Sequence, residues 1–289
     1  MSPPGRAPRL DVEEALRSQG HSFVAGMDEV GRGCLSGPVT VGVVVLGEGA
    51  ARPPRGLRDS KLLTPDARRA LVPRIRRWVL ASAVAHASAA EIDTYGIIAA
   101  LRLAGHRALA ALPSLPDCVL LDGNHNYLAV PSQLALAFED EPSADPQCTA
   151  GQQPAVIRQV VSDDLLLPLV PPVRTQIKAD LRCASVAAAS VLAKTTRDAL
   201  MEQLSHEHPA YGWEINKGYA TPFHRAALRE VGASPYHRVS WRLGLDETID
   251  LPREDEVDDP IVLEAEARTA AGGKMGVGTF DGRSREVPA

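Results

Sequence analysis

The sequence predicts an α/β fold with one main core, in which a β-sheet is covered on both faces. The chain has 289 residues, enough for one large α/β domain with appendages. Strand-like and helix-like segments alternate along it. One segment, residues 39–46 (VTVGVVVL), carries β-branched side chains on both of its faces. That pattern is typical of a strand in a sheet that is covered on both sides.

Four segments are predicted as strands, and they are residues 23–27, 39–46, 78–87 and 118–125. The first ends at Asp28-Glu29, which a glycine-rich turn, GRGCLSGP, follows. The last stops at Asp122, an acid followed by glycine. Acidic residues therefore stand where two of the predicted strands end.

The first predicted helix follows the second strand. Thr64-Pro65-Asp66 is typical of an N-cap with proline at the first helical position, and Leu71 and Ile75 give the helix an apolar face. A second helix, rich in alanine and leucine, is predicted over residues 89–112.

Two further helices are predicted in the C-terminal half. Residues 179–206 form one long helical pattern, in which three consecutive alanines permit close packing on a sheet. Thr221-Pro222 begins another helix, and Gly232 ends it.

Three segments are expected to lie outside the core and to leave residues 21–246 as the folded domain. Residues 1–20 are predicted as a flexible lead-in, and residues 126–172 as a surface insertion that carries one strand, AVIRQVV. Residues 247–289 hold 5 Lys/Arg and 11 Asp/Glu, and are predicted as a disordered acidic tail.

Charge and composition exclude several classes of protein. Hydrophobic residues make up 45% and charged residues 23% of the chain, which excludes a fully disordered, collagen-like or fibrous protein. Without the tail, the net charge of −5 becomes +1, and residues 171–242 hold 10 basic and 6 acidic residues, which is compatible with a nucleic-acid partner. No apolar run approaches the roughly 18–20 residues of a membrane span and no signal peptide is present, so we expect a cytoplasmic protein without a membrane partner.

Four acidic residues are candidates for one site, and they are Asp28, Glu29, Asp122 and Asp180. In an open α/β sheet, sites gather at strand ends and helix N-termini, so these acids can converge. Clustered carboxylates repel unless cations lie among them, and oxygen-only ligands favour Mg²⁺ or Mn²⁺ over zinc. Two such ions balance four acids and are suited to two-metal phosphodiester hydrolysis.

Each of these acids also has an ordinary explanation. An Asp-Glu pair after a strand is typical of a solvated turn, Asp122-Gly123 is a common turn dipeptide, and Asp180 suits the first turn of a helix. Four histidines without metal-ligand spacing are expected to be ordinary polar residues: His125, His208, His224 and His237. The four cysteines, Cys34, Cys118, Cys148 and Cys183, form no CxxC pair and are expected to be small, mostly buried side chains.

Five blocks stand in a fixed order along the chain: AGMDEVGRGCLSGPVTVGVVVL, LRDSKLLTPDARRAL, LLDGNH, KADLRCASVAAASVLAKTTRDALM, and HPAYGWEINKGYATPFHRAAL with SPYHRVSW. In sequence and in order, these blocks resemble those of the type 2 ribonucleases H, the ribonuclease HII family. The resemblance covers roughly residues 22–125 and 173–242. It implies a ribonuclease H-like fold, a central mixed sheet flanked by helices, with C-terminal helical elements.

The resemblance also implies an activity. It is endonucleolytic cleavage of RNA in RNA–DNA hybrids, and on the 5′ side of ribonucleotides embedded in duplex DNA, leaving 3′-hydroxyl and 5′-phosphate ends. The family's metal-binding acids correspond to Asp28, Glu29, Asp122 and Asp180. Two Mn²⁺ or Mg²⁺ ions and a monomeric enzyme are expected.

Substrate-binding residues follow from the same resemblance. Gly31-Arg32-Gly33 corresponds to the sensor of the ribose 2′-hydroxyl, where glycines let the backbone approach the sugar. Tyr219 corresponds to the tyrosine that lies against the sugar at the RNA–DNA junction. Lys61, Lys194 and Arg197 are candidate phosphate contacts, with a solvated or helix-pairing role as the alternative; Lys194 and Asp198 have the i,i+4 spacing of such a pair.

The chain departs from the family pattern at two places. Leu62 stands where the family often has a second lysine, and 58 positions separate Asp122 from Asp180, more than compact members need. The short lead-in and the GRG loop favour type 2 over the sibling type 3 enzymes, which have a large N-terminal domain and a GKG-type loop. A catalytically silent nucleic-acid-binding module and an unrelated metal-dependent phosphatase or nuclease remain as alternative functions.

Overall fold

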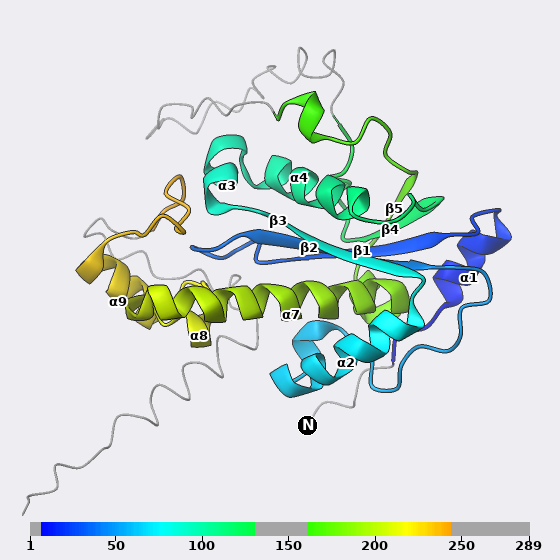
Figure 1. Ribbon diagram of the computed structural model, residues 1–289, viewed down its shortest axis with the longest axis horizontal. Coiled ribbons are helices and arrows are strands. Elements are labelled where there is room, and N and C mark those ends of the chain that lie inside the picture. Colours follow the sequence, from blue (N-terminus) through cyan, green and yellow to red (C-terminus); the bar gives the residue numbers. More distant parts are fainter. Residues whose placement is uncertain (1–6, 131–160, 244–289) are drawn as a thin grey trace, which may run out of the picture. The chain divides into compact units, whose positions relative to one another are not determined.

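A computed structural model of the chain describes residues 7–130 and 161–243 (Figure 1). The predicted tail, Cys148 and nearly all of the predicted strand AVIRQVV lie outside these residues. Among the described residues, Cys34, Cys118 and Cys183 are buried and free, as expected. No helix in this part of the chain is long and apolar enough to cross a membrane.

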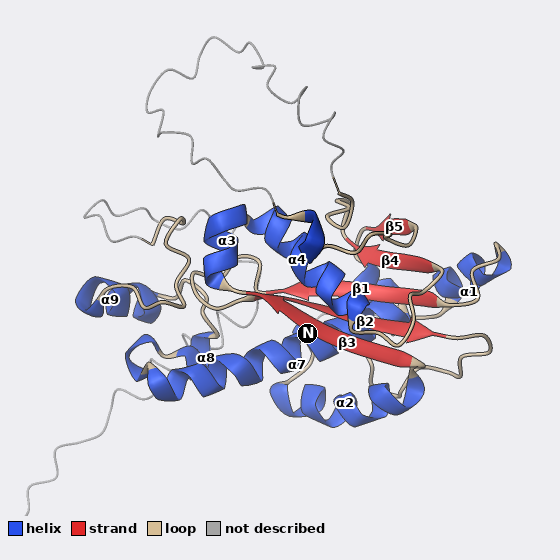
Figure 2. Cartoon of the chain, turned by 45° about the horizontal axis from the view of Figure 1, so that its top comes forward, coloured by secondary structure: helices blue, strands red, loops and turns tan. Residues whose placement is uncertain are grey.

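A five-stranded mixed sheet forms the centre, with the strand order β3-β2-β1-β4-β5 (Figure 2). The strands are β1 Val24–Val30, β2 Val39–Leu46, β3 Ala81–Ala87, β4 Cys118–Asp122 and β5 Val173–Gln176. β1 and β3 pair antiparallel with β2, whereas β4 pairs parallel with both β1 and β5. The predicted mixed sheet is confirmed.

Helices cover both faces of this sheet. They are α1 Asp11–Ser18, α2 Pro65–Trp78, α3 Ala89–Tyr95, α4 Ile97–Ala110, α6 Ala179–Arg182, α7 Ala184–Glu207, α8 Trp213–Asn216 and α9 Pro222–Val231. Three short 3-10 turns are η1 Ser60–Leu62, η2 Asp163–Leu165 and η3 Pro209–Tyr211. Figure 1 shows α3 and α4 on one face, and α7 with α2 on the other.

The valines of β2 explain why both faces are covered. Val39, Val41, Val43 and Val45 pack in the core formed with α4, whereas Val44 packs with α2 and α7. All eight residues of β2 are buried. The two-sided burial that the sequence predicts is therefore confirmed.

Two glycines let α7 lie close to the sheet. A Cβ atom at Gly26 would lie 2.3 Å from the backbone carbon of Ser185, and one at Gly42 would lie 2.5 Å from the carbonyl oxygen of Ala189. The small residues of α7 thus pack directly on the backbone of β1 and β2. This close approach brings Ser190 beside Asp28 of β1, which accepts a hydrogen bond from the Ser190 hydroxyl.

The long helix predicted over residues 179–206 is divided at Cys183. Cys183 has extended backbone angles (φ −103°, ψ 124°) and separates α6 from α7. Arg9 pairs with this position: its N–H donates to the carbonyl of Arg182 at 2.8 Å, and its carbonyl accepts from Ala184 N–H at 2.8 Å. The helix predicted over 89–112 is likewise divided, at Gly96, whose φ of 81° ends α3 before α4 begins.

Parts of the predicted lead-in and of the predicted insertion belong to the folded domain. Within the predicted lead-in, Asp11–Ser18 form α1, and buried Glu13 of this helix accepts hydrogen bonds from the Ser185 N–H at 2.8 Å and hydroxyl at 2.7 Å. At the edges of the predicted insertion, Tyr127 and Leu128 are buried, and Leu167 packs against the same core. These segments belong to the folded domain because their apolar side chains complete its core.

Candidate active site

Three segments bring the four predicted acids to one end of the sheet. In the parallel ladder between β1 and β4, Met27 pairs with Leu121, so that the next residues, Asp28 and Asp122, are neighbours. Asp122 accepts a 2.6 Å hydrogen bond from the N–H of Ala179, which fixes the start of α6. Asp180, the second residue of α6, is thereby held beside the strand ends.

Burial and repulsion both act on these acids. The pKa of Asp28 is raised well above its ordinary value, first by burial and then by the charges of Glu29, Asp122 and Asp180, against a hydrogen bond from Ser190 that lowers it. Burial, followed by the neighbouring Asp59 and Asp122, raises the pKa of Asp180 to about 6. The site therefore carries more negative charge than its own side chains balance.

The side chains of Asp28 and Glu29 point to opposite faces of β1, because successive side chains of a strand alternate. Burial raises its pKa, whereas the charges of Arg32 and Lys61 lower it. Arg32 Nη1 lies 3.8 Å from Glu29 Oε1. Glu29 Oε2 is buried and makes no hydrogen bond of ordinary geometry with the described residues, although the phenol of Tyr127 lies near this carboxylate.

The donor set fits divalent cations. All four side chains offer carboxylate oxygens only, one of those oxygens is buried without an ordinary hydrogen bond, and their excess negative charge favours a cation. Within residues 7–130 and 161–243, no three acid, cysteine or histidine side chains are grouped so that they could hold a metal ion by themselves. A cation at the acids would therefore need further ligands, and Mg²⁺ suits this because it keeps several waters and takes its remaining ligands from substrate phosphates.

Sequence reasoning missed two residues beside the acids. Asp59 is buried, accepts the N–H of Lys61 at 3.1 Å, and raises the pKa of Asp180. Tyr127 is buried, and burial followed by the charge of Glu29 raises its pKa well above 10, so its phenol stays neutral. The available signals were the acid within the DSK block and a lone aromatic five residues after Asp122.

The GRG loop is held at its first residue and open at its last. Gly31 has a φ of +82°, and a Cβ atom there would lie 2.2 Å from Arg197 Nε. Arg238 donates to the carbonyls of Gly31 at 2.5 Å and Arg32 at 2.7 Å. Gly33 is exposed, with no atom within 4 Å of where its Cβ would be. The backbone at Gly33 is thus accessible to a ligand, whereas Gly31 fixes the loop.

The three predicted phosphate contacts lie in different surroundings. Lys61 is exposed, and its charge lowers the pKa of both Glu29 and Asp180, which places it beside the acids. Lys194 is buried and pairs with Asp198 at 3.0 Å, so the helix-pairing alternative is the one the structure supports.

Arg197 requires a correction. It is fully buried, and its guanidinium donates to the backbone carbonyls of Pro38 at 2.9 Å, Lys217 at 2.8 Å and Ser36 at 3.1 Å. A side chain committed to three carbonyls in the interior is not a surface phosphate contact. Arg197 instead joins the segment that follows the GRG loop to the segment that precedes Tyr219.

Tyr219 lies between α8 and α9 and is half-buried. The ammonium of Lys194 lies 5.7 Å from the centroid of its ring. The preceding residue, Gly218, accepts a 2.9 Å hydrogen bond from Leu35 N–H, so Tyr219 follows a residue that is bonded to the GRG-loop segment. Tyr219 and the GRG loop are therefore parts of one connected backbone region.

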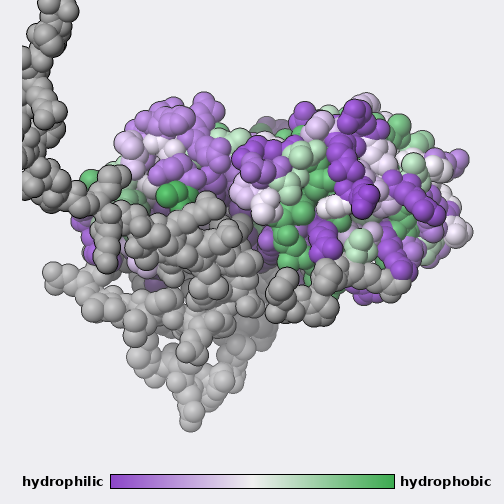
Figure 3. Space-filling view, turned by 90° about the horizontal axis from the view of Figure 1, so that it is seen from below, coloured by the Kyte–Doolittle hydropathy of each residue, from purple (hydrophilic) through white to green (hydrophobic). Residues whose placement is uncertain are grey.

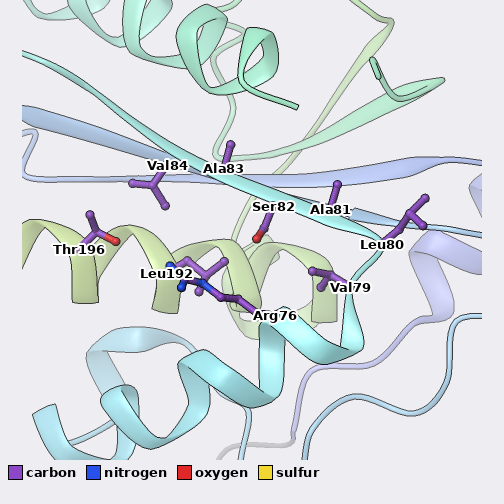
Figure 4. Close-up of a pocket in the computed structure, with 9 residues that line it drawn as sticks. All are labelled: Arg76, Val79, Leu80, Ala81, Ser82, Ala83, Val84, Leu192 and Thr196. Carbon is purple, nitrogen blue, oxygen red and sulfur yellow. The ribbon is translucent and has the colours of Figure 1, made fainter. Parts of the chain in front are cut away.

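A hollow elsewhere on the molecule contains none of these residues. It has a volume of about 530 Å³ and lies between the end of α2, β3 and α7 (Figure 4). It is lined by Arg76, Val79, Leu80, Ala81, Ser82, Ala83, Val84, Leu192 and Thr196. Arg76 is the single charged residue of this lining, so the hollow lacks groups for acid–base or metal chemistry and is not the candidate site.

A basic surface on α2 is a further feature that sequence reasoning missed. This helix carries five arginines against one acid, and four of the arginines are exposed: Arg69, Arg74, Arg76 and Arg77. Figure 3, seen from the side on which α2 lies, shows hydrophilic side chains over much of the described surface. Such a surface suits a polyanion, because it offers positive charge to phosphates.

Comparison with known proteins places the chain among nucleases. The model of the family "Ribonuclease HII" matches residues 25–148 and 154–243. The ribonuclease HII of Streptomyces avermitilis is 44% identical over 239 residues, which are 82% of this chain and 85% of that protein. The ribonuclease HII of Streptomyces griseus is 42% identical over 277 residues, covering 94% of this chain and 98% of that protein.

Solved structures show the same fold. Ribonuclease H2 from Pyrococcus horikoshii superposes with a TM-score of 0.52 at 22% identity, over 86% of this chain and 99% of that one. Ribonuclease HII of Archaeoglobus fulgidus, solved in complex with PCNA, superposes with a TM-score of 0.53 at 22% identity, over 81% of this chain and 99% of that one. At this identity the likeness concerns the fold.

Proposed function

This chain belongs to the ribonuclease HII family and is a type 2 ribonuclease H, and on that premise we propose that it cleaves RNA in RNA–DNA hybrids and on the 5′ side of ribonucleotides embedded in duplex DNA. The observation that carries the proposal is the convergence of Asp28, Asp122 and Asp180 at one end of β1, β4 and α6, with Glu29 next to Asp28. The GRG loop directly follows two of these acids.

The four acids are proposed to hold two divalent cations, Mg²⁺ or Mn²⁺. Their oxygen-only donor set, the buried Glu29 Oε2 without an ordinary hydrogen bond and the excess negative charge support this assignment. The chemistry that such ions supply when bound is activation of a water and stabilisation of the leaving oxygen in phosphodiester hydrolysis.

Recognition of the substrate is assigned to the chain's own residues. The accessible backbone at Gly33 is proposed to contact the ribose 2′-hydroxyl, which distinguishes RNA from DNA. Exposed Arg32 and Lys61 lie beside the acids and are proposed to attract the phosphate backbone. Buried Arg238 and Arg197 position the loop without touching the substrate.

The direction of cleavage follows from two sugar contacts. We assign the ribose to the GRG loop and the neighbouring deoxyribose to Tyr219, so that the enzyme reads a junction between the two. Cleavage on the 5′ side of the ribonucleotide would leave a 3′-hydroxyl and a 5′-phosphate. The proposal takes the enzyme to act as a monomer.

One experiment tests this proposal directly. The purified protein is given Mg²⁺ or Mn²⁺ and three duplexes of the same sequence: DNA with one ribonucleotide, all DNA, and an RNA–DNA hybrid. We expect cleavage of the first and the third, with product ends that map to the 5′ side of the ribonucleotide. Binding without cleavage would instead indicate a silent nucleic-acid-binding module. Cleavage of the all-DNA duplex would indicate a general nuclease, and both results would overturn the proposal.

A further inference from the structure

Two buried histidines lie behind Tyr219 and are not part of the acidic site. His224 stands in the first turn of α9, and His237 stands in the segment that follows α9; their exposed fractions are 0% and 1%. Their Nε2 atoms lie 3.0 Å apart. Two neutral rings in such contact require one of them to donate and the other to accept.

The partners of His237 determine which nitrogen carries its proton. The backbone N–H of Ser234 lies 2.9 Å from His237 Nδ1, and a backbone N–H can only donate. His237 Nδ1 is therefore an acceptor, and the proton is on Nε2. His237 consequently donates from Nε2 to Nε2 of His224.

The partners of His224 give the same answer independently. The indole N–H of Trp213, which can only donate, lies 3.2 Å from His224 Nε2. His224 Nε2 therefore accepts, and its proton is on Nδ1, which lies 2.8 Å from the backbone carbonyl of Tyr219. One continuous chain of donors thus runs from Ser234 through both rings to Tyr219.

We propose that His237 and His224 form a positioning relay for Tyr219: His237 holds His224 in the Nδ1–H tautomer, and this N–H holds the backbone carbonyl of Tyr219. The inference rests on the proposed contact of Tyr219 with the deoxyribose beside the ribonucleotide. Its consequence is that discrimination at the junction depends on two residues that do not touch the substrate.

The surroundings of the pair keep both rings neutral. Tyr211 and Trp213 pack against them, with centroid distances from 4.6 Å (Tyr211 to His237) to 6.3 Å (Trp213 to His224). Burial, followed by the charge of His224, lowers the pKa of His237 to about 4, and burial lowers the pKa of His224. His208 and Arg225, the other charged or titratable neighbours, lower these pKa values further.

Protonation of either ring would break the relay. It would place an N–H on Nδ1 of His237 against the N–H of Ser234, or one on Nε2 of His224 against the N–H donors of His237 and Trp213. The geometry therefore admits one pair of tautomers, which makes the relay testable without any substitution.

A double-mutant cycle tests the link to Tyr219. His224→Leu removes the donor, whereas His224→Asn keeps an amide N–H near the position of Nδ1 and serves as the matched control. In the protein that keeps Tyr219, we expect His224→Leu to lower kcat/KM for the single-ribonucleotide duplex on the order of tenfold, which is the effect of losing one stacking contact. His224→Asn should restore most of this loss. In the Tyr219→Ala background, His224→Leu should cause no further loss.

The outcomes separate the relay from the proposed function. If Tyr219→Ala lowers cleavage of the junction duplex but His224→Leu adds the same loss in both backgrounds, the relay is wrong and the function stands. If Tyr219→Ala changes nothing, the junction contact and the relay both fail, whereas hybrid cleavage still tests the enzyme itself.

A spectroscopic measurement on the wild-type protein covers the case in which the leucine variant does not fold. Long-range ¹H–¹⁵N correlation at about pH 6, below the ordinary histidine pKa of about 6.5, should show both rings neutral, with the proton on Nδ1 of His224 and on Nε2 of His237. A cationic ring, or a His224 proton on Nε2, would overturn the proposal.

Discussion

The guanidinium of Arg238 donates a 2.5 Å hydrogen bond to the carbonyl of Gly31, across 207 positions of sequence. Arg238 is fully buried, and burial lowers its pKa to about 10, so it remains cationic at neutral pH. The last described segment of the chain thus holds the loop that follows β1. Because that loop is the proposed sugar sensor, this contact links the C-terminal segment to specificity.

Replacing Arg238 with lysine should loosen the loop. Lysine keeps the charge but cannot reach the carbonyls of Gly31, Arg32 and Gly37 together, because it lacks the guanidinium fork. We expect a loss of about 1.5–3 kcal/mol in the free energy of unfolding, the value of one charged hydrogen bond. Cleavage of the single-ribonucleotide duplex should fall more than cleavage of a long hybrid. Arg229→Lys on the exposed face of α9 is the matched control, and equal effects of the two variants would contradict the prediction.

Asp28→Asn should reduce turnover strongly while leaving the protein folded. The pKa of Asp28 is raised by burial and by neighbouring acids, so its ionised form is unfavourable in the metal-free fold. Removing that charge should therefore raise the melting temperature without metal, by about 2–4 °C for each kcal/mol gained. Turnover in Mg²⁺ should fall on the order of a hundredfold or more. Near-normal turnover would refute the assignment of the four acids.

Divalent metal should stabilise the wild-type protein. Because an ion that binds the folded state alone adds RT ln(1 + [L]/Kd), Mg²⁺ at 100 times its Kd should add about 2.7 kcal/mol to the free energy of unfolding. The melting temperature is measured with Mg²⁺ and with a chelator. Asp28→Asn and Asp122→Asn should lose most of the difference, and an equal rise in all three proteins would show that the ions bind elsewhere.

The two glycines of the GRG loop should respond in opposite ways to substitution. Gly31→Ala places a Cβ atom against Arg197 at a positive φ, which should cost at least about 1–2 kcal/mol of unfolding free energy. The side chain of Gly33→Val points into open space, so the free energy of unfolding should change by less than about 0.5 kcal/mol. Its side chain should nevertheless obstruct the sugar and raise KM for the junction duplex. Thermal melts and kinetics of both variants check this, and unchanged kinetics for Gly33→Val would remove Gly33 from the interface.

Stability should fall on acidification as His237 becomes protonated in the unfolded chain. Its folded pKa is about 4, below the ordinary value of 6.5, so the folded state binds fewer protons than the unfolded state between these values. The contribution of His237 is therefore fully present above about pH 6.5 and declines as the pH falls through 4. Melting temperatures of the wild type and of His237→Gln, measured from pH 8 to 4, should converge at low pH. Parallel curves would contradict this prediction.

Local sequence was sufficient for several elements, and it singled out acids that the fold brings together. Residues 39–46 form β2 as predicted, because their β-branched side chains suit a strand buried on both faces. Thr64 caps α2 and Thr221 caps α9, each followed by proline at the first helical position, and Gly232 ends α9. Asp28, Glu29 and Asp122 stood out because short apolar runs in the sequence end at them, although β1 itself continues to Val30. These features depend on neighbours in sequence.

Only the tertiary structure determines the partners of polar groups that pair with residues far away in sequence. Local helical propensity predicted a helix that continues past Cys183, but Arg9 pairs at this position and divides the helix. The basic character of Arg197 indicated phosphate, but its partners are three carbonyls brought to it by folding. The spacing of His224 and His237 in the sequence indicated no site, yet folding places their Nε2 atoms 3.0 Å apart. A buried polar group must be satisfied by whatever the fold brings beside it, and that partner is set by long-range packing rather than by local sequence.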